Sequence, residues 1–352
     1  MRILLSLILC LATAGLGLAT FLAIWPTNMW WVRMTDFPRL QYAIAISIVL
    51  LVLALAGRLP DRLRAALAGL LLAALAFNAV KLAPYLPDAT GDTAACAPER
   101  RFSVMVANVK LENHHAAELL EIVREHDPDL LLALETTEWW DRHLAELSGE
   151  MPYSAARITG SFFGMHLLSR LPLSGTEVMV PVGQDTPAIL STVTLPAGDE
   201  VRFLGIHPRP PHPGQSSVGR DAVLMWSGLE ASTAGPPLVL AGDLNAVPWE
   251  RTVERLGRIG GLVDPRRIFG FLPTYDAHSW WMAWPLDQVL HTTGVTVTGL
   301  EVLRGFGSDH YPVEVMLCHQ PTDVSSPELR PGDLDRARAI IAATTRVTPP
   351  AQ

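Results

Sequence analysis

The sequence predicts an α/β (α+β) fold, in which a β-sandwich flanked by helices follows a hydrophobic N-terminal region. Two observations support this prediction. Long apolar stretches are confined to the first 87 residues, whereas the rest of the chain contains short apolar segments separated by Pro and Gly. Helices come between these short segments only in part, which favours a sandwich over a doubly wound parallel sheet.

The N-terminal region, residues 1–87, contains apolar stretches at residues 3–25, 42–57 and 65–82. The first is long enough to cross a bilayer core of about 30 Å as a helix, and the second needs flanking residues to do so. We therefore expect about three transmembrane helices. A cleaved signal peptide is the alternative for the first stretch, but no clear small-residue cleavage site precedes Trp25 and more apolar stretches follow.

The charges around these stretches predict an orientation. Arg2 precedes the first stretch and three arginines crowd the second loop, whereas the first loop has two arginines offset in part by Asp36. This bias favours a cytoplasmic N-terminus, and an odd number of spans then places the remaining chain outside. Trp25, Trp30 and Trp31 fit an aromatic belt at the outer interface, or else pack on the soluble domain.

The composition indicates a bacterial source, because only two of the 27 basic residues are lysines and Ala, Pro and Gly are abundant. We therefore expect a multi-pass protein of the bacterial inner (plasma) membrane with a periplasmic or otherwise extracytoplasmic domain. Residues 93–352 carry 20 Lys and Arg against 31 Asp and Glu, a net charge near −11. Such a net charge is not typical of a protein that binds many nucleic-acid phosphates. Bound cations or a local basic patch would change the charge at a binding site.

The three cysteines leave two alternatives open. Cys10 lies in the first apolar stretch, Cys96 precedes the first soluble strand and Cys318 follows the last. If those two strands are neighbours, Cys96 and Cys318 can form a disulfide, and otherwise both thiols are free.

A polar linker at residues 88–100 leads into the expected domain at residues 101–318. Its first strand, residues 101–108, has alternating buried positions at Val104 and Val106. Apolar residues recur at helical spacing over residues 115–126, which predicts a helix ended by the Asp-Pro-Asp sequence that follows.

The later elements alternate less regularly. A second helix is expected at residues 217–231, and the tail, residues 319–352, is expected to be a surface appendage with one helix near residues 334–344. There is no GxGxxG sequence, no P-loop and no internal repeat. The other expected strands are residues 130–134, 165–169, 190–195, 201–207, 238–241, 286–291, 295–303 and 313–318.

Polar side chains gather where these apolar strands end. Burying such groups at the end of an apolar strand costs free energy unless they bind a ligand, so together they indicate a metal-assisted hydrolytic site. Taken singly, an Asp or Asn at a strand end is more often a turn former. The residues concerned are Asn108, Glu135, His207, Asp243, Asn245, Asp287, Asp309 and His310.

In order, these residues resemble the endonuclease/exonuclease/phosphatase superfamily, which includes DNase I-like nucleases, inositol-polyphosphate phosphatases and neutral sphingomyelinases. The resemblance covers about residues 101–318, and the GDxN and SDH blocks in this order are its most specific part. Gln288 is a mild departure, since members often have His, Tyr or Arg there. The blocks are MVAN at 105–108, LALE at 132–135, GIHP at 205–208, GDLN at 242–245, PLDQVL at 285–290 and SDH at 308–310.

The resemblance implies a four-layer α-β-β-α sandwich of the DNase I-like type and a divalent cation, Mg²⁺ or Mn²⁺. It implies that Glu135, Asp309 and Asn108 hold the metal, consistent with the preference of Mg²⁺ for oxygen ligands. Asp243 would orient or deprotonate the attacking water, with Asn245 on a phosphate oxygen or a second metal. His310, kept protonated by Asp287, and His207 would contact the phosphate.

Several positions bear on the substrate. Lys110 stands where the nucleases commonly have Asp or Arg, two residues after the first-strand Asn, and it is still able to meet a phosphate. Arg209 and Arg220 flank a proline-rich stretch and are candidates for steering a phosphate. The aromatic run from Tyr275 to Trp284 would stack on a base, contact lipid, or close the bottom of the sandwich.

We therefore expect a membrane-anchored, divalent-metal-dependent phosphoesterase that hydrolyses phosphodiester bonds, such as an endonuclease or exonuclease. The alternatives are a lipid phosphodiesterase or phosphatase resembling the sphingomyelinases, and a catalytically silent, membrane-tethered binding module. The expected partners are a nucleic acid or phospholipid head group as substrate and the lipid bilayer. No protein partner is inferred.

Overall fold

The computed structural model describes residues 2–55, 59–87, 96–183, 185–320 and 325–347. The chain forms two compact units, which are described separately. One consists of Met1–Leu86 with Pro211–Ser217, and the other of Pro87–Pro210 with Val218–Gln352. Most of the predicted linker, residues 88–95, lies outside the described residues.

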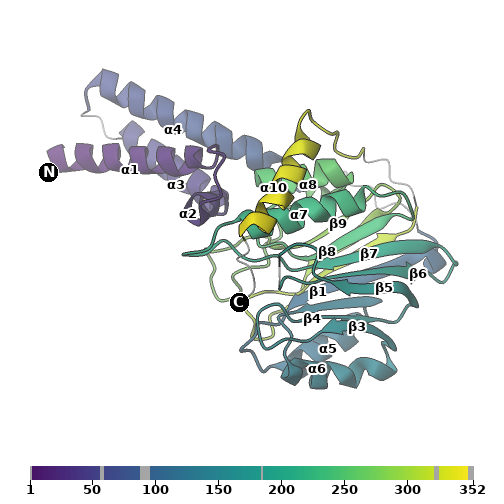
Figure 1. Cartoon of the computed structure of the whole chain (residues 1–352). Coiled ribbons are helices and arrows are strands. Elements are labelled where there is room, and N and C mark those ends of the chain that lie inside the picture. The colour runs from purple at the N-terminus through teal and green to yellow at the C-terminus, as the bar shows by residue number, and fades with distance from the viewer. Residues whose placement is uncertain (1, 56–58, 88–95, 184, 321–324, 348–352) are drawn as a thin grey trace. The chain divides into compact units, whose positions relative to one another are not determined.

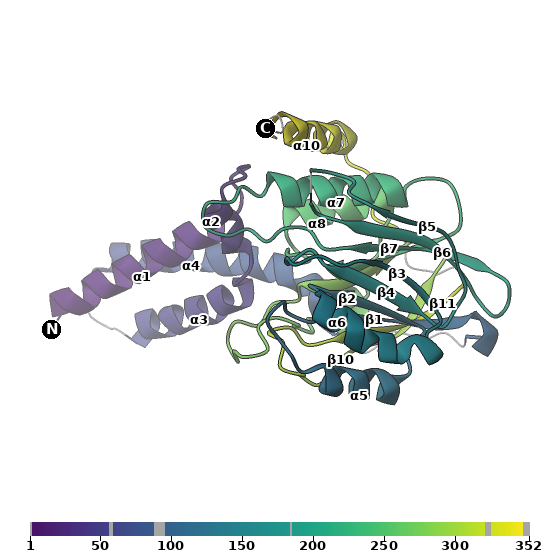
Figure 2. The same ribbon diagram turned by 60° about the horizontal axis from the view of Figure 1, so that its bottom comes forward.

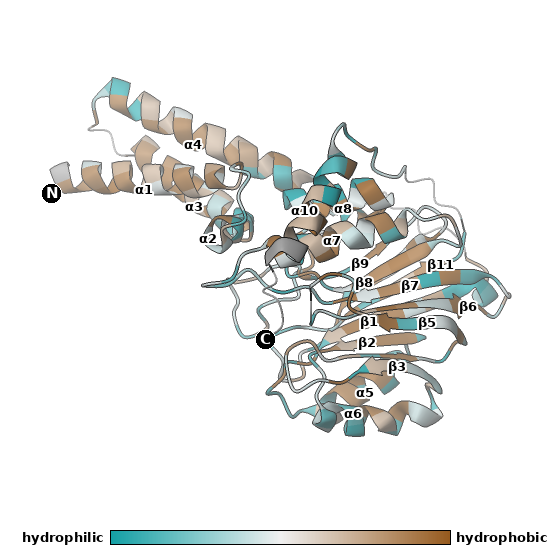
Figure 3. Ribbon diagram, viewed as in Figure 1, coloured by the Kyte–Doolittle hydropathy of each residue, from teal (hydrophilic) through white to brown (hydrophobic). Residues whose placement is uncertain are grey.

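The first unit is helical. Its main helices are α1 (Arg2–Leu22), α3 (Arg39–Leu55) and α4 (Asp61–Leu82), with a short α2 (Trp30–Arg33) after the first. Hydrophobic residues make up most of α1, α3 and α4 (Figure 3). Among the described residues, two helices are long and apolar enough to cross a membrane, and a third span results if residues 30–55, bent by 70°, count as one. That they cross a membrane stays a prediction.

A buried polar network joins the three long helices of this unit. Arg39 donates to Asp36 at 2.5 Å and to the Oδ1 of Asn78 at 3.0 Å, and the Nδ2 of Asn78 lies 3.2 Å from the Oγ1 of Thr20. All four side chains are buried, and the guanidinium also lies over the ring of Phe77. Arg39, one of the two first-loop arginines that were counted for membrane orientation, is therefore enclosed by hydrogen-bonding partners.

The second unit contains two β-sheets (Figure 1). The six-stranded sheet has the order β10-β11-β1-β2-β4-β3 and the five-stranded sheet the order β5-β6-β7-β8-β9. The strands are β1 (Arg101–Asn108), β2 (Leu130–Leu134), β3 (Tyr153–Arg157), β4 (Met165–Ser169), β5 (Leu173–Met179), β6 (Ala188–Thr194), β7 (Glu200–Ile206), β8 (Leu238–Asp243), β9 (Asp287–His291), β10 (Thr296–Val302) and β11 (Val313–Cys318).

Apolar side chains from both sheets meet in one core, which includes Val104, Leu132, Phe203, Val239 and Val289. Helices cover the outer faces (Figure 2). The six-stranded sheet packs against α5 (Ala116–His126) and α6 (Glu138–Leu144), and the five-stranded sheet packs against α7 (Val218–Ala231) and α8 (Arg251–Gly260). The predicted mixed α/β fold with two sheets is thus confirmed.

Two strands were missed and one prediction was wrong. No pattern in the sequence indicates β3 or β5, because both are edge strands whose side chains are mostly exposed and so lack an apolar alternation. The tail is not a mere appendage, since its helix α10 (Asp333–Val347) packs against α7 with Ala337 fully buried. Asp333, at the start of that helix, binds Arg255 and Arg258.

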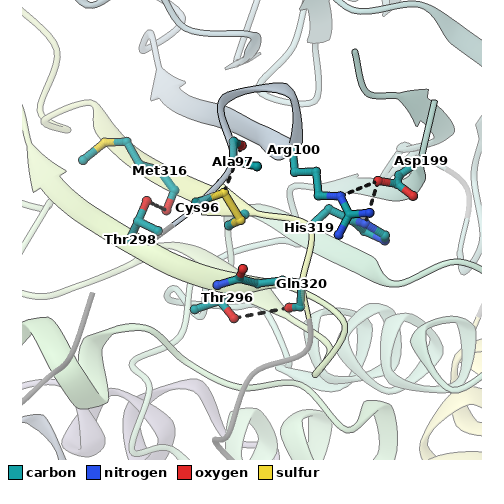
Figure 4. The surroundings of a disulfide bond; sticks show 10 residues. Cys96, Ala97, Arg100, Asp199, Thr296, Thr298, Met316, His319 and Gln320 are labelled. Atoms are coloured by element: carbon teal, nitrogen blue, oxygen red, sulfur yellow. Dashed lines mark hydrogen bonds and ion pairs between the residues drawn. A yellow bond between two sulfur atoms is a disulfide. The ribbon is translucent and has the colours of Figure 1, made fainter. Parts of the chain in front are cut away.

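A disulfide joins Cys96 to Cys318, with Cα atoms 6.0 Å apart (Figure 4). It forms because β1 and β11 are antiparallel neighbours that pair Arg101 with Cys318. Nearby, Asp199 binds Arg100 at 3.2 Å and His319 at 3.4 Å. The disulfide therefore lies at the end of the sheet where β1 begins. The polar residues at the strand ends lie at the opposite end, where β1 finishes at Asn108.

Candidate active site

Strand direction brings the predicted site residues to one edge of the two sheets. β1 and β2 run parallel, so Asn108 at the end of β1 pairs with Leu134, the residue before Glu135. In the other sheet β7 and β8 also run parallel, and β9 pairs Asp287 directly with Asp243 at the end of β8. Each of these residues thus ends, follows or begins a strand at the same edge.

Asn108 connects the two sheets at this edge. Its Nδ2 donates to the Oε1 of Glu135 at 3.0 Å and to the Oδ2 of Asp243 at 3.2 Å. The other oxygen of Glu135 accepts from the backbone N–H of Leu111 at 3.1 Å. Asn108 and Asp243 are about 1 % exposed, so the amide N–H group of Asn108 bridges the two carboxylates in a place with little water.

The backbone at these positions is unusual. Lys110, Glu135 and Asn245 all have left-handed φ values, of 60°, 62° and 50°. Non-glycine residues in this region carry a conformational cost and cluster at functional sites, where surrounding structure holds them in place. The chain therefore turns sharply just after β1, β2 and β8 to direct these side chains into the site.

Gly242 of the GDxN block meets a steric requirement. Its φ is 148°, and a Cβ there would lie 1.8 Å from the carbonyl oxygen of Ile206 on the neighbouring strand. Only glycine allows β8 to pass this close to β7 just before Asp243.

His310 and Asp287 form a buried ion pair. The Nδ1 of His310 lies 2.7 Å from the Oδ2 of Asp287, and its Nε2 lies 3.7 Å from the Oδ2 of Asp243. Burial would lower the pKa of His310, but the carboxylates of Asp287 and Asp243 outweigh burial and raise its pKa to about 10. At neutral pH His310 is therefore an imidazolium whose Nε2–H faces the site.

The two carboxylates around His310 are shifted in opposite directions. Burial raises the pKa of Asp287, but the charge and hydrogen bond of His310 prevail and hold it below its ordinary value. Burial, with repulsion from Asp287, raises the pKa of Asp243 although both His310 and His207 oppose this. Asp287 is thus the fixed anion of the pair, and Asp243 is the better proton acceptor.

His207 approaches Asp243 from the other side. Its Nε2 lies 3.7 Å from the Oδ2 of Asp243 and 4.0 Å from the Oε1 of Glu135. Within the described part of the chain its Nδ1 has no hydrogen-bond partner. Two imidazole nitrogens, those of His207 and His310, therefore flank one carboxylate oxygen of Asp243.

Asn245 and Arg220 are structural partners in this arrangement. The Nδ2 of Asn245 donates to the carbonyl of Pro208 at 2.9 Å, which fixes the segment after His207. Arg220 is 1 % exposed and binds Glu250 at 2.5 Å and the carbonyl of Asn245 at 2.9 Å. The expectation that Arg220 steers a phosphate is wrong, because its guanidinium is enclosed beneath the GDxN loop.

Arg209 lies closer to the open side. It forms an ion pair with Asp185, and its guanidinium lies 4.8 Å from the ring centroid of Phe163. That ring is 6.3 Å from the ring of His207. A role for Arg209 in phosphate steering stays a prediction.

Asp309 takes a different partner from the other predicted metal ligands. Its Oδ2 lies 3.1 Å from the ammonium of Lys110, and its side chain is 25 % exposed. The group of described acidic and His side chains close enough to hold a metal together is Asp243, Asp287 and His310. The structure thus brings Asn108, Glu135 and Asp243 into direct contact and places Asp309 beside a lysine.

The aromatic run divides into two parts. The ring of Tyr275 lies 4.9 Å from that of His310 and so lies beside the site, and Trp284 stacks on Tyr275. Trp280 and Trp281 are 94 % and 54 % exposed, which rules out the interpretation that they close the sandwich.

Sequence reasoning missed three supporting residues. The Oγ1 of Thr274 accepts from the backbone N–H of Asp287 at 3.1 Å, and the ring of Phe163 flanks His207. Ser308 donates to the carbonyl of Asn108 at 2.7 Å, and its place in the SDH block was the one available signal. Gln288, the departure noted above, donates to the carbonyl of Ala246 at 2.6 Å and so holds the GDxN loop.

The side chains present fit a hard divalent cation. Glu135 and Asp243 offer carboxylate oxygens on either side of Asn108, whose amide N–H group donates to both and whose amide oxygen accepts from the backbone N–H of Lys110. The side chain of Glu135 remains 15 % exposed. Oxygen donors of this kind suit Mg²⁺ or Mn²⁺, which bind through one or two protein carboxylates.

Solved structures share this fold. A humanized TDP2 from D. rerio, with 14 mutations, has a TM-score of 0.54 and 15% identity, and the match covers 62% of this chain and 99% of that one. The human Nocturnin catalytic domain with bound sulfate has a TM-score of 0.51 and 16% identity, with 63% and 96% covered. An endonuclease/exonuclease/phosphatase from Beutenbergia cavernae has a TM-score of 0.51 and 18% identity, with 63% and 72% covered.

The sequence comparisons agree with the geometry. No curated protein matches the chain. Residues 105–310 match the model of the Endonuclease/Exonuclease/phosphatase family, and this range contains the site residues from Asn108 to His310. The match extends over more than half of the 352 residues, so the chain belongs to the Endonuclease/Exonuclease/phosphatase family and is a phosphoesterase of that family.

Proposed function

We propose that this chain is a membrane-anchored, divalent-metal-dependent hydrolase of phosphodiester bonds. The observation that carries the proposal is the placement of one Asp243 carboxylate oxygen between two imidazole nitrogens, each 3.7 Å away. A proton acceptor beside an imidazolium, with a second imidazole on its other side, suits hydrolysis of a phosphate ester.

The residues have distinct roles in the proposed reaction. Glu135 and Asn108, with Asp309 as a further candidate, would hold Mg²⁺ or Mn²⁺, which when bound neutralises charge on the phosphate and on the leaving oxygen. Asp243 accepts the proton of the attacking water, for which its raised pKa suits it. The protonated Nε2 of His310 donates to a non-bridging oxygen, where negative charge builds up as the water attacks.

A nucleic acid is the first candidate substrate. D. rerio TDP2, which shares the fold at 16% identity and a TM-score of 0.54, has been solved with a single-strand DNA product. That finding concerns TDP2, and it supports a phosphodiester in a site of this shape. An endonuclease or exonuclease activity is the corresponding proposal for this chain.

A lipid phosphoester is the second candidate, and one observation favours it. Trp280 and Trp281, 94 % and 54 % exposed, belong to the loop that continues from Tyr275, whose ring contacts His310. Exposed tryptophans beside a site suit a lipid–water interface as well as base stacking. The net charge near −11 of residues 93–352 also disfavours a long polyanion.

The proposed location is the bacterial inner membrane, with the second unit outside the cytoplasm. The length and hydropathy of α1 and α4 support the anchoring, and the distribution of arginines supports the orientation. Two measurements test this: the full chain should stay with membranes after an alkaline carbonate wash, and protease added to spheroplasts should cleave the second unit. Release by the wash would contradict the anchor, and protection from protease would contradict the orientation.

Hydrolysis by the full chain in detergent tests the activity. We expect turnover of bis-p-nitrophenyl phosphate with Mg²⁺ or Mn²⁺, none with EDTA, and a loss of at least about 100-fold in Glu135→Gln. Glu138→Gln, an exposed carboxylate on α6, is the matched control and should keep full activity. Plasmid DNA, single-stranded DNA and sphingomyelin in parallel rank the substrates. Absence of turnover on all of them by a folded protein would favour the silent binding module.

A further inference from the structure

Lys110 occupies a controlling position beside the proposed metal site. Its backbone N–H donates to the Oδ1 of Asn108 at 3.0 Å, and the next N–H, of Leu111, donates to Glu135 at 3.1 Å. The left-handed turn at Lys110, with φ at 60°, therefore fixes the orientation of both proposed ligands. The same residue sends its side chain to Asp309.

The ammonium of Lys110 lies 3.1 Å from the Oδ2 of Asp309, within the range of a charge-assisted hydrogen bond. A lysine ammonium is a compact point charge, which resembles a metal ion more than a guanidinium does. A divalent cation bound to the same carboxylate would have to displace this ammonium or sit against a like charge. Asp309 is thus already neutralised by a residue of the chain itself.

We propose that Lys110 acts as a built-in cation at Asp309, so that the site binds one divalent metal, through Glu135 and Asn108, and excludes a second. The inference rests on the metal dependence proposed above and deepens it. Two contacts carry it, the ion pair with Asp309 and the separate contact of Asn108 with Glu135 at 3.0 Å. The carboxylate of Asp309 therefore has the ammonium of Lys110 as its counter-ion, whereas the oxygens of Glu135 accept from the neutral N–H groups of Asn108 and Leu111.

In this arrangement Lys110 would also contact the substrate. Its side chain is 36 % exposed, so the ammonium has donors left for a non-bridging phosphate oxygen after it binds Asp309. It would hold the substrate on the side of the site that a second metal would otherwise occupy. Lys110 thus determines how many metal ions the site binds.

Binding of Mn²⁺ to the full chain in detergent, measured by equilibrium dialysis and by electron paramagnetic resonance of the free ion, tests the inference without turnover. We expect one Mn²⁺ per wild-type chain and two per chain of Lys110→Met, which removes the charge but keeps the stem. Lys110→Gly is a second neutral variant that suits the left-handed φ, and it should also bind two. Lys110→Arg keeps the charge and should bind one.

Lys81→Met, at the other lysine of the chain, lies in α4 and is the control for loss of a lysine. It should bind one Mn²⁺. Glu135→Gln should lose the first ion, which identifies it as the ion of this site.

The outcomes separate the two proposals. One ion in both the wild type and the neutral variants, or two already in the wild type, would overturn the role of Lys110 and leave metal dependence standing. No ion in the wild type, or an ion that Glu135→Gln does not remove, would overturn the metal dependence itself.

Discussion

Replacing Asp287 with Asn removes the charge that holds His310 protonated in a buried place. The two side chains are 2.7 Å apart and only 7 % and 1 % exposed, so solvent screens the pair very little. Removing one partner of a buried ion pair costs about 3–5 kcal/mol, because the other charge stays buried without compensation. We expect a loss of about 3 kcal/mol in the free energy of unfolding near pH 6, since His310 can lower the cost by releasing its proton.

The pH dependence of this loss follows from the direction of each shift. The pKa of His310 is raised from 6.5 to about 10, so its contribution to stability is fully present below pH 6.5 and is lost as the pH rises toward 10. The pKa of Asp287 is lowered, so its contribution is present above its ordinary value and is lost in acid. The difference between the wild type and Asp287→Asn should therefore be largest near pH 6 and shrink toward pH 10.

Thermal unfolding of the full chain in detergent and EDTA, at about pH 6, 8 and 10, measures this difference. EDTA keeps a bound metal from adding to the stability of either protein. Asp335→Asn is the control, because Asp335 lies on α10 and is 88 % exposed. A difference that stays constant from pH 6 to pH 10, or no destabilisation at pH 6, would refute the assignment of a charged pair.

Three further predictions concern stability and folding. Gly242→Ala places a Cβ against the carbonyl oxygen of the adjacent strand at a φ of 148°, so we expect a loss of at least about 2 kcal/mol in the free energy of unfolding. Thermal unfolding measures this loss, and an unchanged midpoint would contradict the steric argument. Cys96→Ser removes the disulfide between residues 222 positions apart, and we expect a loss of about 2–5 kcal/mol in the free energy of unfolding. Reductant should destabilise the wild type but not the variant, and free thiols at Cys96 and Cys318 in oxidised protein would contradict the disulfide. Arg220→Met removes the guanidinium that binds the buried carboxylate of Glu250, and we expect a loss of about 3–5 kcal/mol in the free energy of unfolding. A change below about 1 kcal/mol would contradict the structural role of Arg220.

Much of the fold and of the candidate site could be predicted from the sequence. The buried strands β1, β2, β4 and β8 were expected because apolar runs of four to eight residues between turn signals leave few other structures. The edge strands β3 and β5 could not be predicted, because their faces meet solvent and their sequences carry no pattern. Local patterns therefore reveal an element only where at least one of its faces is buried.

The sequence by itself determined which chemical groups stand at the strand ends, and in what order, because these groups interrupt apolar runs at fixed places. It also determined the apolar helices of the first unit. The partners of Arg220 and Lys110 were decided only in the tertiary structure, which buries Arg220 against Glu250 and pairs Lys110 with Asp309, 199 positions later in the chain. Pairing between distant segments depends on sheet order and register, and no local pattern encodes these. The exposure of Trp280 likewise follows from the path of its loop away from the core, since its residue type alone favours burial.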